Sequence, residues 1–247
     1  MLLRCCGATD VGGRPDNEDF YSILKLEHKS GIYHLLAVAD GVWSCDAGEI
    51  ASELAVMTLI DAVRMGLSSL KSVSRESLRE LLRDGFRKAN EAVCDRSKTL
   101  PEGCDLSTTL VAALLDDNGR GAVANVGDSR AYLLGDEIVR VTKDHSFVQE
   151  LIDAGMLRED KAFGHPHKNI VTKVIGMRGV KPDLFNIDLG DKDILILCSD
   201  GISDVLREEQ IKELVLNSGA ENICKHLIEI VKPISYDNIT VIAARVE

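Results

Sequence analysis

The sequence lacks the short motifs of several common enzyme classes. It contains no Gly-Lys dipeptide, which excludes a nucleotide-binding loop of the G-x-x-x-x-G-K type, and it contains no H-E-x-x-H zinc motif. No Cys is followed by Arg six positions later, so the anion-binding loop that cysteine nucleophiles use is absent as well. The longest uninterrupted apolar run, Leu110 to Leu115, is far shorter than the ~20 residues that a membrane-spanning helix needs.

Positive charge is also scarce. The chain has 247 residues, with 29 Lys and Arg against 40 Asp and Glu, and its formal net charge is −11 at pH 7. Because like charges repel, we expect neither nucleic acid nor an anionic membrane as a partner. The first residues carry no long apolar stretch of the kind that a secretory leader has, and we therefore expect a cytoplasmic protein.

Cysteine pairs at metal or redox spacing are missing. The seven Cys include no C-x-x-C, and an odd number in a chain of this size does not indicate a disulfide framework. We therefore expect reduced, mostly buried thiols. A redox role for the vicinal pair Cys5-Cys6 stays open, although strand geometry would point the two side chains to opposite faces.

What the sequence does contain is a long series of short strands. Apolar runs bounded by turn residues predict strands over 20–26, 32–39, 106–115, 121–126, 130–134, 138–141, 194–198 and 239–246. Helical spacing of apolar residues predicts helices over 47–62, 77–93, 147–154, 208–216 and 220–231. Turns join most neighbouring strands, which favours packed antiparallel sheets flanked by helices over a parallel sheet. No linker or repeat divides the chain, so we expect a single domain over residues 1–247.

Carboxylates stand where the apolar strands end. Four of them adjoin a strand beside a turn residue, namely Asp40, Asp128, Asp200 and Asp237, and Glu18-Asp19 directly precedes a fifth strand. A carboxylate at the edge of an apolar core is unfavourable unless it is paired or bound to a cation. Ligation by oxygen alone favours Mg²⁺ or Mn²⁺ over Zn²⁺. Each Asp-Gly is equally well explained as a plain turn, so the residues alone leave a metal cluster and a set of turns both open.

The carboxylates belong to a longer ordered set of motifs. In sequence order it reads Arg14-Pro15-Asp16-Asn17-Glu18-Asp19, Ala39-Asp40-Gly41, Ser107-Thr108-Thr109, Asn125 to Arg130, Thr142 to Ser146, Ser199-Asp200-Gly201 and Asp237-Asn238. This set resembles the metal-dependent Ser/Thr protein phosphatase family, the PPM or type 2C class, in its compact bacterial or archaeal form. The resemblance spans Arg14 to Val246. It implies an α+β fold, in which a central antiparallel β-sandwich is flanked by helices on both outer faces in α/β/β/α layers.

The resemblance also implies a reaction and its cofactors. The family hydrolyses phosphoserine and phosphothreonine in proteins with a water activated between two Mn²⁺ or Mg²⁺ ions, and many members hold a third, weaker ion. The implied partner is a phosphorylated protein that a Ser/Thr kinase supplies, and we expect a monomer. The alternative is a non-catalytic relative that binds a partner or a phosphopeptide. Such a protein should have lost metal ligands, whereas all the matching acids are present here.

Roles in the metal centre carry over position by position as expectations. Asp40 matches the carboxylate that bridges both ions, and Gly41 matches the donor of a backbone carbonyl. The further metal ligands are Glu18, Asp200 and Asp237, with Asp128 and Asp204 for the third ion.

Three further features complete the expected site. Asp19 matches a neighbouring acid that supports the ligands, and Arg14 matches the arginine that grips the substrate phosphate. The catalytic set is therefore Arg14, Asp40 and Asp19. Residues 146–178 match a variable flap subdomain beside the site.

The chain departs from the family pattern in its glycine-rich loops. Trp43-Ser44 stands where relatives usually carry Gly-Gly after the Asp-Gly turn, and Ser235-Tyr236 replaces a second Gly pair. The ring of Trp43 should lie within ~10 Å of the ions, where it either lines the substrate entrance or packs under the flap. Val42 stands where eukaryotic relatives carry a His that is thought to act as general acid. His145 is expected to be structural.

Overall fold

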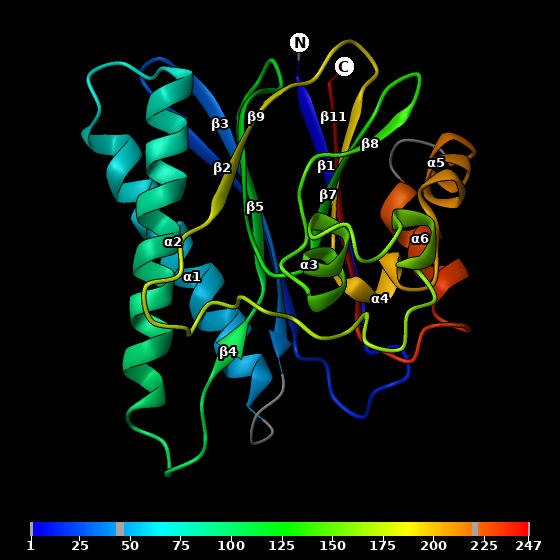
Figure 1. The fold of residues 1–247 in the computed structure, drawn as a ribbon. Coiled ribbons are helices and arrows are strands. Elements are labelled where there is room, and N and C mark those ends of the chain that lie inside the picture. Colours follow the sequence, from blue (N-terminus) through cyan, green and yellow to red (C-terminus); the bar gives the residue numbers. More distant parts are fainter. Residues whose placement is uncertain (1, 43–46, 219–221, 247) are drawn as a thin grey trace.

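The computed structural model describes residues 2–42, 47–218 and 222–246. Two antiparallel sheets lie face to face at its centre (Figure 1). One has the strand order β2 (Asp19–His28), β3 (Gly31–Val42), β5 (Leu110–Asp116), β6 (Arg120–Val126) and β9 (Asp183–Asp188), with β4 (Ser107–Thr108) paired to the end of β3. The other has the order β1 (Leu3–Asp10), β11 (Ile239–Val246), β10 (Ile194–Cys198), β7 (Arg130–Leu134) and β8 (Ile138–Arg140).

Helices cover the outer face of each sheet (Figure 1). Two long helices, α1 (Gly48–Ser69) and α2 (Arg75–Ser97), pack on the sheet that contains β3. Three shorter helices cover the other sheet, namely α4 (Asp200–Ser203), α5 (Glu208–Leu216) and α6 (Ile223–Val231). The segment between β8 and β9 holds α3 (Phe147–Asp153) and the 3₁₀ turn η1 (Glu159–Lys161). The expected antiparallel sandwich with helices on both outer faces is confirmed.

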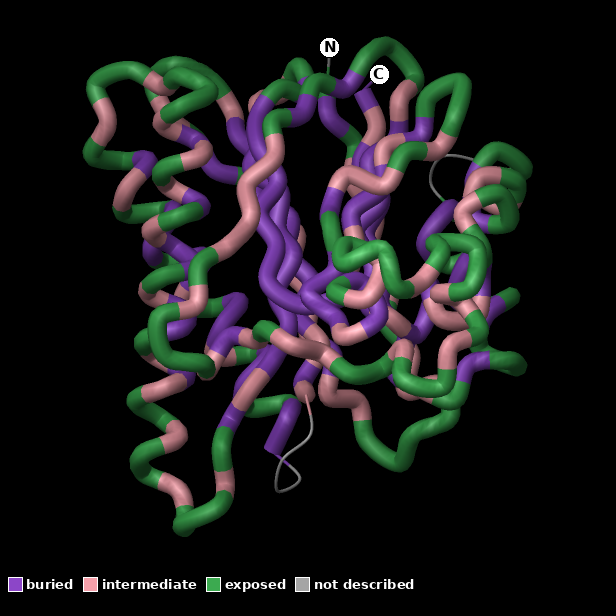
Figure 2. Tube along the Cα trace, viewed as in Figure 1, coloured by how far each residue is buried: buried purple, intermediate pink, exposed green. Residues whose placement is uncertain are grey.

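Strand alternation explains why the central strands read as continuous apolar runs. Along β3, Leu35 and Ala37 face α1 and α2, whereas Leu36 and Val38 face the second sheet. Both faces of this strand are therefore buried, as Figure 2 shows for the middle of each sheet. The two helices close over the first face at short range. A Cβ placed on Gly85 of α2 would lie 2.5 Å from Cδ1 of Leu59 on α1.

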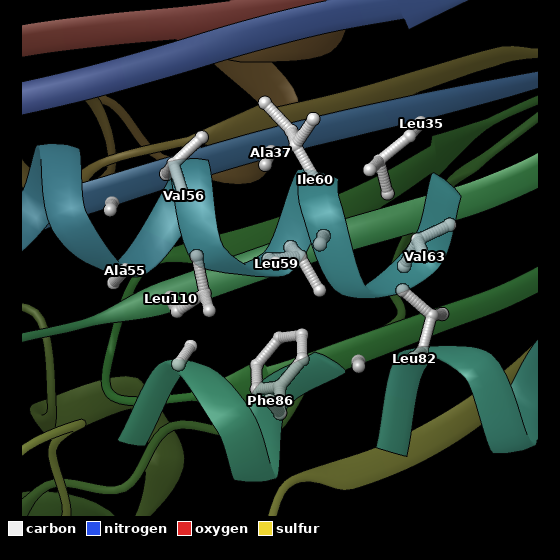
Figure 3. Packing of buried hydrophobic residues seen from close by; sticks show 14 of the residues in the cluster. Leu35, Ala37, Ala55, Val56, Leu59, Ile60, Val63, Leu82, Phe86 and Leu110 are labelled. Carbon is white, nitrogen blue, oxygen red and sulfur yellow. The ribbon is translucent and has the colours of Figure 1, made fainter. Parts of the chain in front are cut away.

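The packing of these two helices forms the largest apolar cluster in the described part of the chain. Phe86 and Leu82 of α2 lie against Leu59 and Val63 of α1, above Leu110 of the sheet (Figure 3). Phe86 is 1% exposed, and Leu59 is fully buried. Full burial of such a side chain contributes about 1.5–3 kcal/mol to stability, so this layer is a rigid base for the strands beside it.

Several elements differ from the sequence-based expectation. Strands β1 and β9 were not predicted, because both are edge strands with polar residues on their open side, which weakens the apolar pattern. Helix α4 has only four residues, too few to show helical spacing. The run over 106–115 divides into β4 and β5 at Thr109, whose N–H bonds to the main-chain oxygen of Asp40.

The described cysteines differ from expectation in two ways. The free thiols are Cys5, Cys6, Cys94, Cys198 and Cys224, and only the last two of these are buried, so the expectation of mostly buried thiols is wrong. Cys104 is disulfide-bonded, so the expectation of reduced thiols is wrong there. None of the helices in the described ranges is both long enough and apolar enough to span a bilayer.

Candidate active site

Four strands from both sheets deliver acids to the same end of the sandwich, which lies away from the chain termini (Figure 1). Asp40 lies at the end of β3 and pairs in register with Asp19, the first residue of β2. Asp200 follows β10, and Asp237 precedes the antiparallel β11. Antiparallel neighbours alternate in direction, so the C-terminal end of one strand meets the N-terminal end of the next. This topology explains how acids far apart in sequence converge.

Hydroxyl groups from the neighbouring strands fix the backbone of Asp40. Its N–H donates to Oγ1 of Thr109 at 3.0 Å, and its carbonyl oxygen accepts from Oγ1 of Thr108 at 2.8 Å. Thr109 Oγ1 also lies 2.7 Å from the hydroxyl of Ser129, which is fully buried. The Thr-Thr motif therefore holds the position of Asp40, a role that sequence reasoning did not assign.

Glu18 is held by partners from three distant segments. Its N–H donates to Oδ1 of Asn238 at 2.9 Å, and its carbonyl oxygen accepts from Oγ of Ser52 at 2.7 Å and from the N–H of Gly41 at 3.1 Å. Gly48 at the start of α1 leaves room for the carboxylate, because a Cβ there would lie 2.8 Å from Cδ of Glu18. The side chain of Glu18 is thereby placed beside the start of α1.

Asn238 and Ser199 are further positioning residues that the sequence did not reveal. Nδ2 of Asn238 donates to the carbonyl oxygens of Val11 and Asp16, both at 2.9 Å, and so fastens the loop that precedes Glu18. Oγ of Ser199 donates to Oδ2 of Asp19 at 2.7 Å and accepts from a main-chain N–H of β11. These bonds tie the ends of the two sheets together.

The site acids raise one another's pKa. Burial raises the pKa of Asp40 and of Asp200 well above the usual range, and neighbouring carboxylates add to the effect. Burial also raises the pKa of Asp128 to about 7 and that of Asp19 to about 6. Asp237 contributes to the rise at Asp40, Asp200 and Asp19. A cluster of buried like charges is stable only when protons or cations neutralise it.

Two carboxylate oxygens in this cluster have no partner among the described residues. Oδ1 of Asp19 and Oδ1 of Asp200 are buried and accept no hydrogen bond from that part of the chain. In the described ranges, no three side chains of His, Cys, Asp or Glu stand close enough to hold one ion by themselves. Mg²⁺ needs only one or two carboxylates, because it keeps several of its waters. Orphaned oxygens in a sparse, oxygen-only set therefore fit a hydrated hard cation and not Zn²⁺.

Arg14 brings positive charge to the edge of the cluster. Its Nη2 donates to Oδ2 of Asp237 at 2.7 Å, and this bond raises the pKa of the guanidinium. The side chain of Arg14 is 46% exposed, so the guanidinium faces both the acids and the solvent. A group in this position is able to contact an anion that approaches the acids from outside.

The remaining sequence-predicted residues lie as follows. Asp128 follows β6 and interacts with Asp204, which ends α4 and forms an ion pair with Lys168. His145 is buried, and its ring contacts the N–H of Gly127 and the carboxylate of Asp183, as expected for a structural residue. Trp43 and Ser44 lie outside the described residues. The structure thus brings Arg14, Glu18, Asp19, Asp40, Gly41, Asp128, Asp200, Asp204 and Asp237 to one end of the fold.

Comparisons with known proteins agree with this arrangement. The family model for protein phosphatase 2C matches residues 13–233. The serine/threonine phosphatase stp of Listeria innocua is 35% identical over 240 residues, which cover 95% of this chain and 92% of the relative. The crystal structure of the Mycobacterium tuberculosis serine/threonine phosphatase PstP/Ppp superposes with a TM-score of 0.86 at 32% identity and covers 100% of both chains. A structure of the PstP catalytic domain in complex with two manganese ions has a TM-score of 0.82 at 31% identity, covering 99% of this chain and 98% of the other. This chain belongs to the protein phosphatase 2C family.

Proposed function

We propose that the acidic end of the two sheets is the active site of a metal-dependent protein phosphatase that acts on phosphoserine and phosphothreonine. The activity class follows from the family and from relatives named serine/threonine phosphatases. The observation that supports this location is the convergence of Asp40, Asp200 and Asp237 from both sheets, with two orphaned carboxylate oxygens beside them.

The residues fit two hard cations. Asp40 would be the ligand common to both ions, Glu18 and the carbonyl of Gly41 would help to hold one of them, and Asp200 and Asp237 would help to hold the other. When bound, Mn²⁺ or Mg²⁺ would acidify a water and neutralise charge on the phosphoryl group. The choice of Mn²⁺ or Mg²⁺, and a third ion at Asp128 and Asp204, are part of the same proposal.

Two side chains would support the reaction from outside the ligand set. Arg14, which contacts Asp237 from the solvent side, would donate two parallel hydrogen bonds to the phosphate oxygens of an anion that approaches the acids. Asp19, whose Oδ2 is fixed by Ser199, keeps a buried Oδ1 that would accept a hydrogen bond from a water at the site. Phosphoryl transfer depends on positioning and electrostatics more than on a covalent nucleophile, and the rigid strand ends supply the positioning.

The wider setting belongs to the proposal as well. We place the activity in a single phosphatase domain that spans the chain, with a flap over 146–178. The substrate class implies a Ser/Thr kinase that supplies the phosphorylated protein. A monomeric state and a cytoplasmic location remain predictions.

The proposal is tested with a phosphothreonine peptide. We expect phosphate release with Mn²⁺ or Mg²⁺ and none in EDTA, with full recovery when the ion is restored. Asp40→Asn serves as a matched control, because it should stay folded and inactive under both conditions. Undiminished release in EDTA would rule out the metal-dependent mechanism.

A further inference from the structure

One lysine of the flap, residues 146–178, forms an ion pair at the acidic end. Nζ of Lys168 donates to the carbonyl oxygen of Asp204 at 3.0 Å and lies 2.9 Å from Oδ2 of the same residue. The two side chains are 29% and 25% exposed, so this ion pair is partly shielded from water. Asp204 ends the short helix that Asp200 begins, and the ammonium group therefore lies beside the acids.

An aromatic ring fixes the same part of the flap. The ring of Phe163 has Nζ of Lys168 at 5.6 Å from its centroid and Cζ of Arg207 at 4.4 Å. Arg207 precedes the first turn of α5, so Phe163 attaches the flap to that helix. Figure 1 shows the segment after α3 running from the side of α5 and α6 beneath both sheets toward α2. Lys168 and Phe163 hold its first half.

The corner around Asp204 needs positive charge. Asp204 is among the charges that raise the pKa of both Asp128 and Asp200. Arg130 lies nearby, but its guanidinium is engaged by Asp144 through bonds of 3.0 and 2.7 Å. The ammonium group of Lys168 is thus the cation that contacts the carboxylate of Asp204 directly.

The same corner has space for a hydrated ion. The residues that line a cavity of about 270 Å³ include Asp128, Asp200, Asp204, Phe163 and Lys168. A water occupies about 30 Å³ of liquid, so this volume is large enough for a cation with several waters.

We propose that Lys168 is a built-in cation that competes with a third divalent ion for the carboxylate of Asp204, so that binding of this ion releases the flap. The inference rests on the proposed function, in which Asp128 and Asp204 take that ion. A ligand oxygen lies ~2.1 Å from Mg²⁺, and an ammonium 2.9 Å from the same oxygen would face strong repulsion from the ion. The two cations therefore compete for Oδ2 of Asp204.

Competition of this kind links the ion to the flap in both directions. If the ion weakens the attachment of the flap, then loss of the attachment must strengthen ion binding by the same factor. Low divalent ion concentration keeps the flap attached to α4 and α5. High concentration frees residues 155–170 to move beside the substrate site.

The test compares two lysines of the same flap. Lys168→Met removes the charge and keeps an unbranched apolar chain that still packs on Phe163. Lys161→Met is the matched control, because Lys161 is 69% exposed and its one ion pair with the described residues is with Asp160, at 3.9 Å. Calorimetric titration of each metal-free protein with MnCl₂ gives the number of ions and their affinities. We expect two tight ions in every protein, and a third that binds K168M about tenfold more tightly than wild type or K161M.

Hydrogen exchange of residues 155–170 gives a readout that is independent of catalysis. In wild type and K161M, exchange should increase only at Mn²⁺ concentrations that fill the third site. In K168M it should be fast without metal and insensitive to Mn²⁺, and Lys168→Arg should restore the wild-type pattern. The proposal is overturned if K168M binds the third ion no more tightly than wild type, if neither protein binds one, or if the flap exchanges equally in all variants. Failure of the first two ions to bind would instead contradict the proposed function.

Discussion

The middle and the end of the same strands follow opposite rules. In the middle of β3, Leu36, Ala37 and Val38 are fully buried between the two sheets and the helices, which stabilises the fold. Two residues further on, burial of Asp40 raises its pKa well above the usual range, which means that the charged form is destabilised there. Strand β10 repeats the pattern with its apolar residues and Asp200. Stability and the proposed chemistry thus occupy successive segments of one chain.

The acidic end tolerates its charges because the backbone around them is fixed independently. Thr109 holds the main chain of Asp40, Ser199 holds the side chain of Asp19, and Asn238 holds the loop before Glu18. None of these bonds requires a metal. A site built in this way is preorganised for cations, and the apolar layers behind it need not change when they bind.

The largest effect is expected when a charge is removed at the acidic end, because this change should affect metal binding and leave the apolar middle of the strands intact. In Asp200→Asn or Asp237→Asn the shape is kept and a ligand charge is lost, so kcat/KM for a phosphopeptide at low Mn²⁺ should fall more than ~100-fold. Even the partners of metal ligands are worth about 10–100-fold in affinity. Without metal, the melting temperature should increase, because repulsion between carboxylates is relieved.

The matched control is Asp61→Asn, since Asp61 is 65% exposed on α1. It should change neither the Mn²⁺ titration nor the melting temperature in EDTA. Near wild-type turnover of either site variant at low Mn²⁺ would show that the residue is not a ligand.

A substitution in the apolar layer should instead lower stability and leave metal binding unchanged. Phe86→Ala should lower the free energy of unfolding by about 3–5 kcal/mol, because Phe86 is 1% exposed against Leu59 and little in the layer can refill its volume. Denaturant unfolding measures the loss. Mn²⁺ affinity at a temperature where the variant is folded should match wild type. A parallel loss of Mn²⁺ affinity would show that the layer and the acidic end are coupled.

The sequence predicts these two regions unequally. Buried strands and the acids at their ends can be predicted together, because an apolar run that stops at Asp-Gly indicates both a strand and a carboxylate at its end. The edge strands β1 and β9 escape prediction, because their polar residues face outward. The positioning roles of Thr109, Ser199 and Asn238 are not predicted either, although the motif set contains these residues. A polar residue in a sequence does not indicate a hydrogen-bond partner that lies many residues away in the chain.

The ion pair of Asp204 with Lys168 is a feature of the site that the sequence does not predict. Resemblance to the family places it among the acids of a third ion, but nothing in its neighbouring sequence points to Lys168, 36 residues earlier. Long-range ion pairs depend on how loops pack, and loops carry little periodic signal. The attachment of the flap could therefore be learned only from the structure.

A smaller effect is expected where the acidic end meets the substrate. Arg14→Ala should lower kcat/KM for a phosphopeptide about tenfold to a hundredfold, because a hydrogen bond between charged groups is worth ~1.5–3 kcal/mol. The same change removes the partner of Asp237, so Mn²⁺ affinity should stay equal or rise slightly. Unchanged kinetics would show that Arg14 is a surface residue with no role in binding the substrate. A large drop in Mn²⁺ affinity would contradict its assignment to the phosphate.

The smallest effect concerns pH. The folded-state pKa is about 6 for Asp19 and about 7 for Asp128, both raised from 3.8 by burial. A carboxyl group with a raised pKa binds more protons in the folded state, so its contribution to stability is full below pH ~4 and is lost as pH rises through 6 and 7. His145, whose pKa is lowered by burial, changes stability in the opposite direction, so the test compares wild type with a variant of Asp128 at each pH.

In EDTA, the melting temperature of wild type minus that of Asp128→Asn should fall between pH 5 and pH 8. With saturating Mn²⁺ the trend should reverse, because ions replace the protons and bind better as pH rises. A difference that stays flat in EDTA would show that Asp128 does not titrate between pH 5 and pH 8. Burial at the acidic end would then not destabilise the charged form of this carboxylate.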